Sequence, residues 1–233
     1  MNTLLLFVEI LVAFGSVLLV NKIFKKEGLY VWIGLATVLA NLQLAKCVDI
    51  FGINATLGNV MFASTFLATD IISECYGKKE AKKGVWIGLF CVVSFVIFSQ
   101  ITLAYTPNDL DFVNESMVNL FTIAPRICIS SIIMYFIANY SDVLLYNFLK
   151  KVFKGKYVWV RNNVSTIVCN CLENFGLFIL MFAGIFSFKD MMIMALATSL
   201  IEIVIAVCDT PFLYIAKKTT KNKQEVELVE NKC

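Results

Sequence analysis

The chain contains no histidine, and only 16% of its 233 residues are charged. The absence of histidine excludes Ser–His and Cys–His nucleophile pairs, histidine general acid–base catalysis and histidine-ligated metals. Eight cysteines are present, but none forms a Cys-x-x-Cys pair, and most lie in apolar runs where cysteine packs as a small hydrophobic residue. The sequence has no phosphate-binding loop and no dinucleotide fingerprint. We therefore expect a protein that is not an enzyme, needs no cofactor and carries no ATP-driven engine.

Hydrophobic residues make up 59% of the chain, and the mean hydropathy is +0.79. They form repeated blocks of about 20 residues, the length that a helix needs to cross a bilayer. A soluble protein with a large core is disfavoured, because such long blocks recur along the whole chain. The sequence predicts an all-α integral membrane protein with one transmembrane domain, residues 1–216, and a disordered cytoplasmic tail, residues 217–233. The expected seven transmembrane helices lie at about residues 3–23, 29–47, 58–76, 84–105, 121–149, 158–187 and 191–216.

The positions of the basic residues predict the orientation of these spans, since Lys and Arg concentrate in cytoplasmic connections. Seventeen of the 20 basic residues lie in four segments: residues 22–26, 78–83, 150–161 and the tail. Seven spans place all four segments on one side, and the acidic connection at 106–116 on the other. We therefore expect an outside amino terminus and a cytoplasmic carboxyl terminus in the cytoplasmic membrane. The basic connections suit contact with anionic lipid and give no case for nucleic-acid binding.

Acidic residues occur inside the expected spans, where a charge costs at least about 2.5 kcal/mol and usually has a function. Asp70 and Glu74 lie one turn apart in the third span; Asp70 is the deeper, and Glu74 is expected near the basic loop, in a structural or coupling role. Glu202 and Asp209 lie seven residues apart in the last span, followed by Pro211, which we expect to open the helix locally. Asp209 and Pro211 are also assigned structural or coupling roles.

The sixth span carries a polar stripe at steps of three and four residues, which places the stripe on one helical face. Its members are Asn163, Thr166, Asn170, Glu173 and Asn174. Amides on such a face can join helices by hydrogen bonds, but this role explains Glu173 less well. We expect Asn170, Glu173 and Asn174 to face a solute cavity.

Three further polar residues are predicted near the outer mouth of that cavity: Gln43, Lys46 and Arg126. The alternative for the two basic residues is that they extend to the lipid headgroups. Taken with Asp70, Asn170, Glu173, Asn174 and Glu202, they form the predicted substrate site. Carboxylates at its centre suit a small polar solute with several N–H donors, and the many aromatic residues suit a planar heterocycle.

Residues 58–83, "GNVMFASTFLATDIISECYGKKEAKK", resemble the queuosine precursor transporter family of vitamin-uptake-transporter-like membrane proteins. The resemblance continues through "APRICISSIIMYFIAN", "WVRNNVSTIVCNCLENFGLFILMFAGIF" and "DTPFLYIAKK". It implies a six-helix core, similar to the substrate-binding subunits of energy-coupling-factor importers, with the first span as an extra amino-terminal helix. It also implies uptake of 7-deazaguanine bases (preQ0, preQ1 or queuine), salvaged for tRNA modification.

Two departures from the family pattern concern the predicted site. Many members have Gln and Asp where this chain has Asn170 and Glu173, and many have Lys where it has Glu202. The site is therefore more acidic than is usual in the family. A 7-deazaguanine edge offers a ring N–H and an amino group, which one carboxylate can accept together. We expect Glu173 to bind this edge and Asp70 or Glu202 to take a second role.

Several alternative functions are consistent with some of these observations. The chain could be a binding subunit that needs a separate energising ATPase module, docked through small-residue segments at 35–41 and 195–200, or a transporter of another heterocycle or vitamin. An intramembrane aspartyl protease using Asp70 and Asp209 lacks the glycine-rich context expected around "CDTPF". A purely structural subunit is disfavoured, because the acids within the spans would then carry a burial cost without a function. The sequence leaves homodimerisation open.

Overall fold

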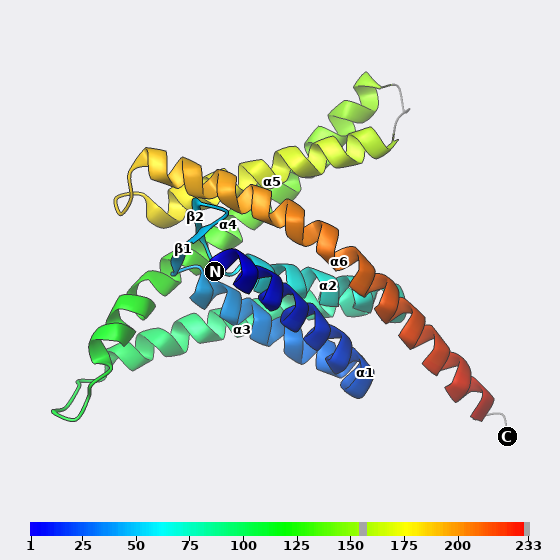
Figure 1. Cartoon of the computed structure of the whole chain (residues 1–233), viewed down its shortest axis with the longest axis horizontal. Coiled ribbons are helices and arrows are strands. Elements are labelled where there is room, and N and C mark those ends of the chain that lie inside the picture. Colours follow the sequence, from blue (N-terminus) through cyan, green and yellow to red (C-terminus); the bar gives the residue numbers. More distant parts are fainter. Residues whose placement is uncertain (154–157, 231–233) are drawn as a thin grey trace.

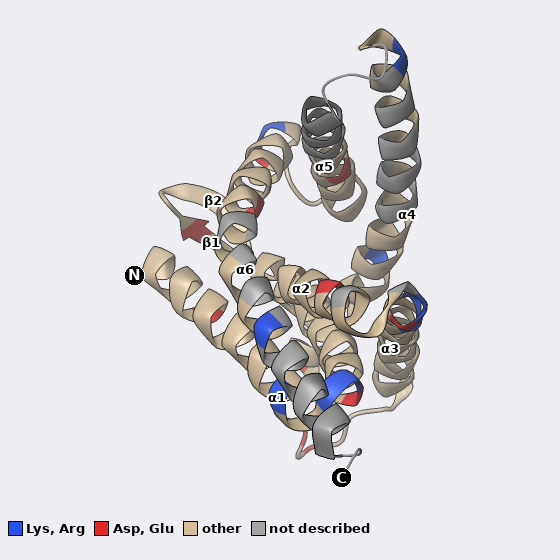
Figure 2. Ribbon diagram, turned by 90° about the vertical axis from the view of Figure 1, so that its right-hand side faces the viewer, with Lys and Arg blue, Asp and Glu red and all other residues tan. Residues whose placement is uncertain are grey.

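The computed structural model describes residues 1–153 and 158–230, apart from a number of side chains within those ranges. Its elements are the helices α1 (Asn2–Gln43), α2 (Asn59–Tyr76), α3 (Lys78–Ala104), α4 (Asn114–Val152), α5 (Val158–Phe182) and α6 (Phe188–Glu230), with the short strands β1 (Cys47–Ile50) and β2 (Ile53–Thr56). The helices dominate the molecule, as the sequence predicts. In the view of Figure 2, α1–α3 form one group, α4 and α5 a second, and α6 runs along both.

Helix α1 is a bent element that takes in the first two expected spans. At Lys25 the backbone leaves the helical region, with φ 54° and ψ −138°. The two arms then run side by side in opposite directions (Figure 1), and Gln43 Nε2 donates to Glu9 Oε1 at 3.0 Å. The sequence places a connection at this point because Lys22, Lys25 and Lys26 interrupt the apolar run.

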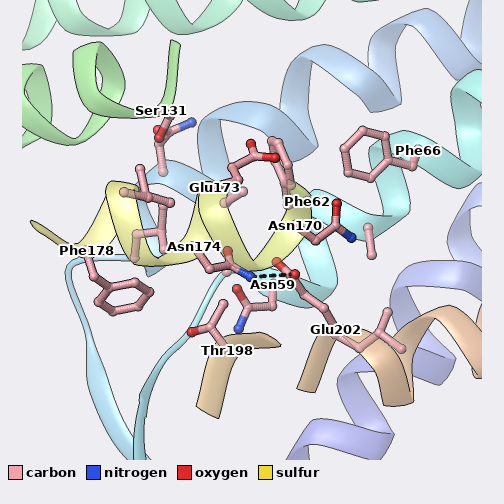
Figure 3. A pocket seen from close by; sticks show the side chains of 17 residues that line it. Asn59, Phe62, Phe66, Ser131, Asn170, Glu173, Asn174, Phe178, Thr198 and Glu202 are labelled. Carbon is pink, nitrogen blue, oxygen red and sulfur yellow. Dashed lines mark hydrogen bonds between the residues drawn. The ribbon is translucent and has the colours of Figure 1, made fainter. Parts of the chain in front are cut away.

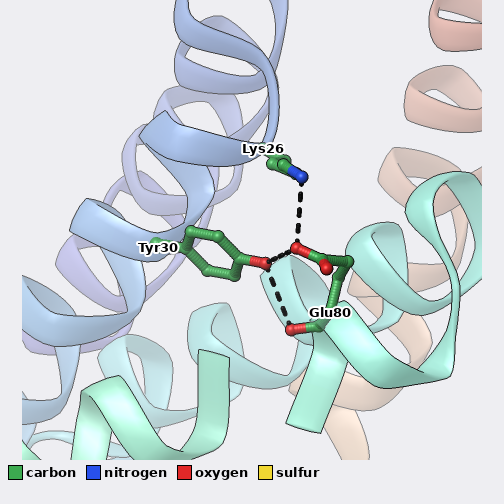
Figure 4. Close-up of polar contacts among 3 residues, drawn as sticks. All are labelled: Lys26, Tyr30 and Glu80. Carbon is green, nitrogen blue, oxygen red and sulfur yellow. Dashed lines mark hydrogen bonds and ion pairs between the residues drawn. The ribbon is translucent and has the colours of Figure 1, made fainter. Parts of the chain in front are cut away.

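Three side chains join the bend of α1 to the first turn of α3 (Figure 4). The Tyr30 hydroxyl donates to Glu80 Oε2 at 2.6 Å, and Lys26 Nζ lies 3.1 Å from the same oxygen. Lys83 Nζ lies 5.6 Å from the centre of the Tyr30 ring. Lys26, Tyr30 and Glu80 thus hold the start of α3 against the second arm of α1.

A β-hairpin fills the connection between α1 and α2, and it is an addition to the all-α fold that the sequence predicts. Cys47 pairs with Thr56 and Ile50 with Ile53 in an antiparallel register. Phe51 and Gly52 form its turn with φ values of 52° and 77°, the combination that a tight hairpin turn requires. Asn2 Nδ2 donates to the Asp49 carbonyl oxygen at 3.0 Å, so the amino terminus packs against the hairpin.

Several helix boundaries differ from the expected spans, and two differ by seven residues or more. Helix α4 begins at Asn114, seven residues before the expected fifth span, and α6 continues through residues 217–230, where the sequence predicts disorder. The second difference follows from composition, since Lys, Gln, Glu and Leu in "KNKQEVELVE" all have high helix propensity. Helix α6 is also unbroken at Pro211, against the expected local opening.

The described residues contain three helices long and apolar enough to cross a membrane: Asn2–Gln43, Lys79–Ala104 and Asn114–Met134. Two shorter apolar helices are Asn59–Ser73 and Val168–Phe182. The chain is thus a predominantly helical, multi-pass membrane protein. In Figure 1 the bend of α1, the α2–α3 junction, the end of α4 and the end of α6 all lie toward the right-hand side, while the connections after α3 and α5 lie on the left.

Two groups of buried side chains hold these helices together. The larger group lies where α1, α2 and α6 meet, and it includes Phe14, Leu29, Ile71 and Ile205. The smaller group includes Phe178. It joins the first part of α4 to the end of α5 and the start of α6, on either side of the connection between those two helices. The space between the two groups is where the polar cavity lies.

Candidate functional site

A cavity of about 210 Å³ lies between α1, α2, α4, α5 and α6. Four of its lining residues are the polar ones that the sequence assigned to the site: Asn170, Glu173, Asn174 and Glu202. Asn41, Asn59, Ser131 and Thr198 add further polar side chains to the lining. Figure 3 shows these groups converging on one space from different helices.

Helical spacing explains how α5 and α6 present their polar groups. Asn170, Glu173 and Asn174 are three and four residues apart on α5, and Thr198 and Glu202 are four apart on α6. Residues at these intervals share a helical face. The two helices pack together, so the faces meet at the cavity.

A hydrogen-bond chain fixes the orientation of Glu202. Asn174 Nδ2 donates to Glu202 Oε2 at 2.8 Å and to Ser199 Oγ at 3.0 Å, and Ser199 in turn donates to the Ala195 carbonyl oxygen at 3.0 Å. Asn174 is only 4% exposed. Because both amide hydrogens of Asn174 are engaged inside the protein, its carbonyl oxygen is the part left to meet a solute.

Glu173 differs from Glu202 in its surroundings. It is half-buried, and its carboxylate makes no hydrogen bond to any residue described in the structure. In Figure 3 its side chain leaves α5 toward Phe62, away from the Asn174–Glu202 pair. The cavity therefore offers two separate carboxylates, one held in place by the protein and one open to a solute.

A tight approach of α1 and α2 closes one side of the cavity. Gly58, just before α2, has φ +101°, and a Cβ there would lie 2.6 Å from the Ala40 carbonyl oxygen. Only glycine fits such a position without displacing the backbone. On α1, Asn41 Nδ2 donates to the Thr37 carbonyl oxygen at 2.8 Å, and Cys128 Sγ of α4 lies 3.5 Å from Asn41 Oδ1.

Aromatic side chains supply apolar walls. Phe62 and Phe66, on successive turns of α2, meet edge to face with ring centres 5.0 Å apart. Phe178 of α5 lies across the cavity and is fully buried. No Lys or Arg occurs among the described lining residues, so the site combines acidic and amide groups with aromatic surfaces.

The structure places four other predicted site residues away from this lining. Asp70 is exposed on α2, and Lys46 is exposed between α1 and β1. Gln43 donates to Glu9 in the first helical hairpin. Arg126 Nε donates to the Leu180 carbonyl oxygen at 2.9 Å and Arg126 Nη2 to that of Ala183 at 2.6 Å. Arg126 therefore binds carbonyl groups at the end of α5, which lack partners within that helix.

The three residues assigned structural or coupling roles are only partly described. The side chains of Glu74 and Asp209, like those of Asn163 and Thr166, lie outside the described residues. Pro211 is exposed within α6. Among the described residues, no group of three or more His, Cys, Asp or Glu side chains is placed to hold a metal ion.

Sequence reasoning missed several lining residues. Thr198 could have been found, since it lies one turn before Glu202 on the same helical face. Asn41, Asn59 and Ser131 carry no comparable signal, because single polar residues in apolar helices more often join neighbouring helices.

Comparison with known proteins gives the chain its family. Residues 56–216 match the family model described as "Putative vitamin uptake transporter". The chain is 35% identical to the "Probable queuosine precursor transporter" of Bacillus subtilis (strain 168), over 92% of this chain and 94% of the relative. The chain belongs to the queuosine precursor transporter family. A protein of the same description from Haemophilus influenzae is 26% identical over 57% of this chain and 54% of that protein.

No solved structure matches the chain. The segment matched by the family model, residues 56–216, contains every described lining residue except Ala40 and Asn41 of α1 and Leu44 just after it. The cavity therefore lies largely within the part of the chain that this membrane-transporter family shares.

Proposed function

We propose that this protein imports 7-deazaguanine precursors of queuosine across the cytoplasmic membrane, without a catalytic step. Its family membership and the description of the Bacillus relative support transport of this class of solute. The observation that carries the proposal is the cavity in which Glu173, Glu202 and four asparagines face aromatic walls. A fused-ring base with several N–H donors is the solute that such a lining fits best.

Within this proposal, Glu173 binds the guanine-like edge of the base. A 7-deazaguanine presents a ring N–H and an adjacent amino group, and a carboxylate accepts both through its two oxygens. Phe62 and Phe66 lie beside the carboxylate, where a planar base can contact their rings. A cavity of about 210 Å³ is smaller than the roughly 300–1,000 Å³ of sites for drug-sized ligands. Its size suits a base without a ribose.

The proposal includes seven membrane crossings, with the amino terminus outside and the carboxyl terminus in the cytoplasm. The two arms of α1 would each cross once, and α2 to α6 once each. The bend of α1, the α2–α3 junction and the ends of α4 and α6 carry most of the basic residues and share one side of the molecule (Figure 1). Such a one-sided distribution is typical of a cytoplasmic surface.

Transport by this chain alone is favoured over a binding subunit that needs an ATPase module. The two small-residue segments considered for docking are largely used inside the protein. Ala36 and Ala40 of the first segment and Ala195 and Ala197 of the second are buried. They cannot also form an exposed docking surface for another protein.

The proposal is tested in a bacterial strain that can neither make nor import queuosine precursors. Expression of this protein, with a supplied precursor, should restore queuosine to the tRNA. Persistent absence of queuosine, with the protein present in the membrane, would contradict the proposal. Uptake into proteoliposomes holding only the purified protein separates a stand-alone carrier from a subunit, since a subunit would bind the precursor without accumulating it.

A further inference from the structure

Three hydrogen-bond acceptors line the α6 side of the cavity. Glu202 is held by Asn174, whose carbonyl oxygen is left for a solute. The Thr198 hydroxyl lines the same cavity, is 2% exposed, and has no hydrogen-bond partner among the described residues. In Figure 3, Asn174, Thr198 and Glu202 lie on the same side of α5, and Glu173 lies on the other.

Among the described residues that line the cavity, no positive charge balances this group of acceptors. None of the 17 residues that line the cavity is Lys or Arg. A carboxylate removed from water is stabilised only by a paired charge or by several hydrogen bonds. Asn174 supplies one such bond to Glu202. A ligand with N–H donors and a positive charge would supply the rest.

We propose that Asn174, Thr198 and Glu202 bind a protonated amine on the substrate, so that this transporter selects a 7-deazaguanine with an aminomethyl group over one with a nitrile. The inference rests on the proposed function and concerns the substrate class at the same site. An ammonium group has three N–H donors, which match the three acceptors in number. A nitrile has none, and it would leave the Glu202 charge uncompensated.

The two carboxylates thus have separate tasks. Glu173 binds the guanine-like edge that both bases share, and Glu202 distinguishes their substituents. The fixed orientation of Glu202 suits this role, because an acceptor already held in place loses little freedom when the ligand binds.

The test compares the binding of the aminomethyl and nitrile bases to purified protein at neutral pH. Wild-type protein should bind the amine at least about tenfold more tightly, the effect expected of a hydrogen bond to a charged group. Glu202→Gln, which can still accept the Asn174 bond, should remove this preference by weakening amine binding alone. Equal wild-type affinity for the two bases would overturn the inference, and it is the result expected if a proton neutralises Glu202 instead.

Thr198→Val provides a second variant with an independent readout. It removes the hydroxyl while keeping the shape, so amine binding should weaken, and thermal stability should stay the same or rise because an unpartnered buried hydroxyl is lost. A fall in stability with unchanged amine selectivity would assign Thr198 a structural role and contradict its place in the site. Asp190→Asn, at the exposed start of the same helix, is the matched control and should change neither affinity.

The outcomes separate this inference from the proposed function. Failure of both bases to bind the wild-type protein would count against the proposed function itself. If the wild-type protein binds both bases and Glu202→Gln weakens the binding of both equally, the proposed function is retained but the inferred selectivity is wrong. Loss of amine binding in Glu202→Gln with retained nitrile binding supports both, and the retained binding shows that the variant is folded.

Discussion

Glu173 is the residue on which recognition of the base depends most directly. Its carboxylate is open to the cavity, and two acceptor oxygens on one group match the paired donors of a guanine-like edge. Glu173→Gln keeps the size but replaces one acceptor with an N–H donor that opposes the ligand. Precursor affinity should therefore fall about ten- to a hundredfold. Binding measurements on purified protein check this.

The control for that measurement is Glu115→Gln, an exposed acid in the first turn of α4, outside the cavity. It should bind the precursor as wild type does. Unchanged affinity in Glu173→Gln would remove Glu173 from the base-binding role. Equal losses in both variants would point to a general effect of lost negative charge.

The individual site residues were predictable from sequence to different degrees. The positions of Asn170, Glu173 and Asn174 at a cavity were predictable, because amides and an acid at helical spacing need a polar partner wherever the helix packs. For Asp70, the sequence predicted a deep acid but not the direction of its side chain, and the structure places it on an exposed face of α2. For Arg126, charge and depth did not reveal that the carbonyl groups ending α5 lie within reach.

Among the elements, the α1–α2 contact depends on Gly58. Both Gly58 and Gly52 have positive φ, but only at Gly58 would a Cβ meet the Ala40 carbonyl oxygen, at 2.6 Å. Alanine at either position costs about 1–2 kcal/mol for its backbone conformation, and Gly58→Ala must also push α1 from α2. We expect Gly58→Ala to lower the melting temperature more than Gly52→Ala, and to weaken precursor binding.

Comparing Gly58→Ala with Gly52→Ala separates the effect of the close contact between α1 and α2 from the effect of backbone strain. Gly52 lies in the hairpin turn with no atom near its missing Cβ, so Gly52→Ala carries the strain alone and should leave binding intact. Equal effects of the two substitutions on stability and binding would show that the contact with Ala40 does not shape the cavity.

The bend of α1 and the start of α3 are joined by the Tyr30–Glu80 hydrogen bond. Tyr30→Phe keeps the ring beneath Lys83 but removes the hydroxyl, so it leaves Glu80 with Lys26 as its side-chain partner. The melting temperature should fall, with little change in precursor affinity because the site lies elsewhere. Tyr105→Phe, at a 76% exposed position, is the control, and a fall of the same size there would contradict a specific role for Tyr30.

The break at Lys25 was predictable, because charge interrupts an apolar run there, and so was the end of α2 before Gly77, whereas α3 begins at Lys78, six residues before the expected span. The hairpin of β1 and β2 was not, because strands of four residues give too short a pattern to separate from a loop. The extra turns of α6 were missed for a different reason. Charged segments were assumed to be disordered, whereas their high helix propensity allows the helix to continue.

At the scale of the whole molecule, the distribution of charge and the arrangement of helices support the same topology. The basic segments are far apart in sequence, yet the elements that carry them end on one side of the structure (Figure 1). The acidic connection 106–116 lies on the opposite side with the α5–α6 connection. Lys and Arg are retained on the cytoplasmic face during membrane insertion, which gives the proposed orientation a physical cause.

Cysteine labelling in intact cells tests this topology with four positions that the structure shows exposed: Lys79, Leu110, Lys151 and Phe188. Each is replaced by Cys in a variant whose native cysteines have been removed and whose uptake activity has been verified. A membrane-impermeant maleimide should label Leu110→Cys and Phe188→Cys from outside. It should label Lys79→Cys and Lys151→Cys only after the cells are permeabilised.

Labelling of Lys79→Cys and Leu110→Cys from the same side would mean that α3 does not cross the membrane, and the seven-crossing topology would be wrong. Reversal of all four sites would keep the crossings but invert the protein, and the basic ends would then face outward against the charge rule.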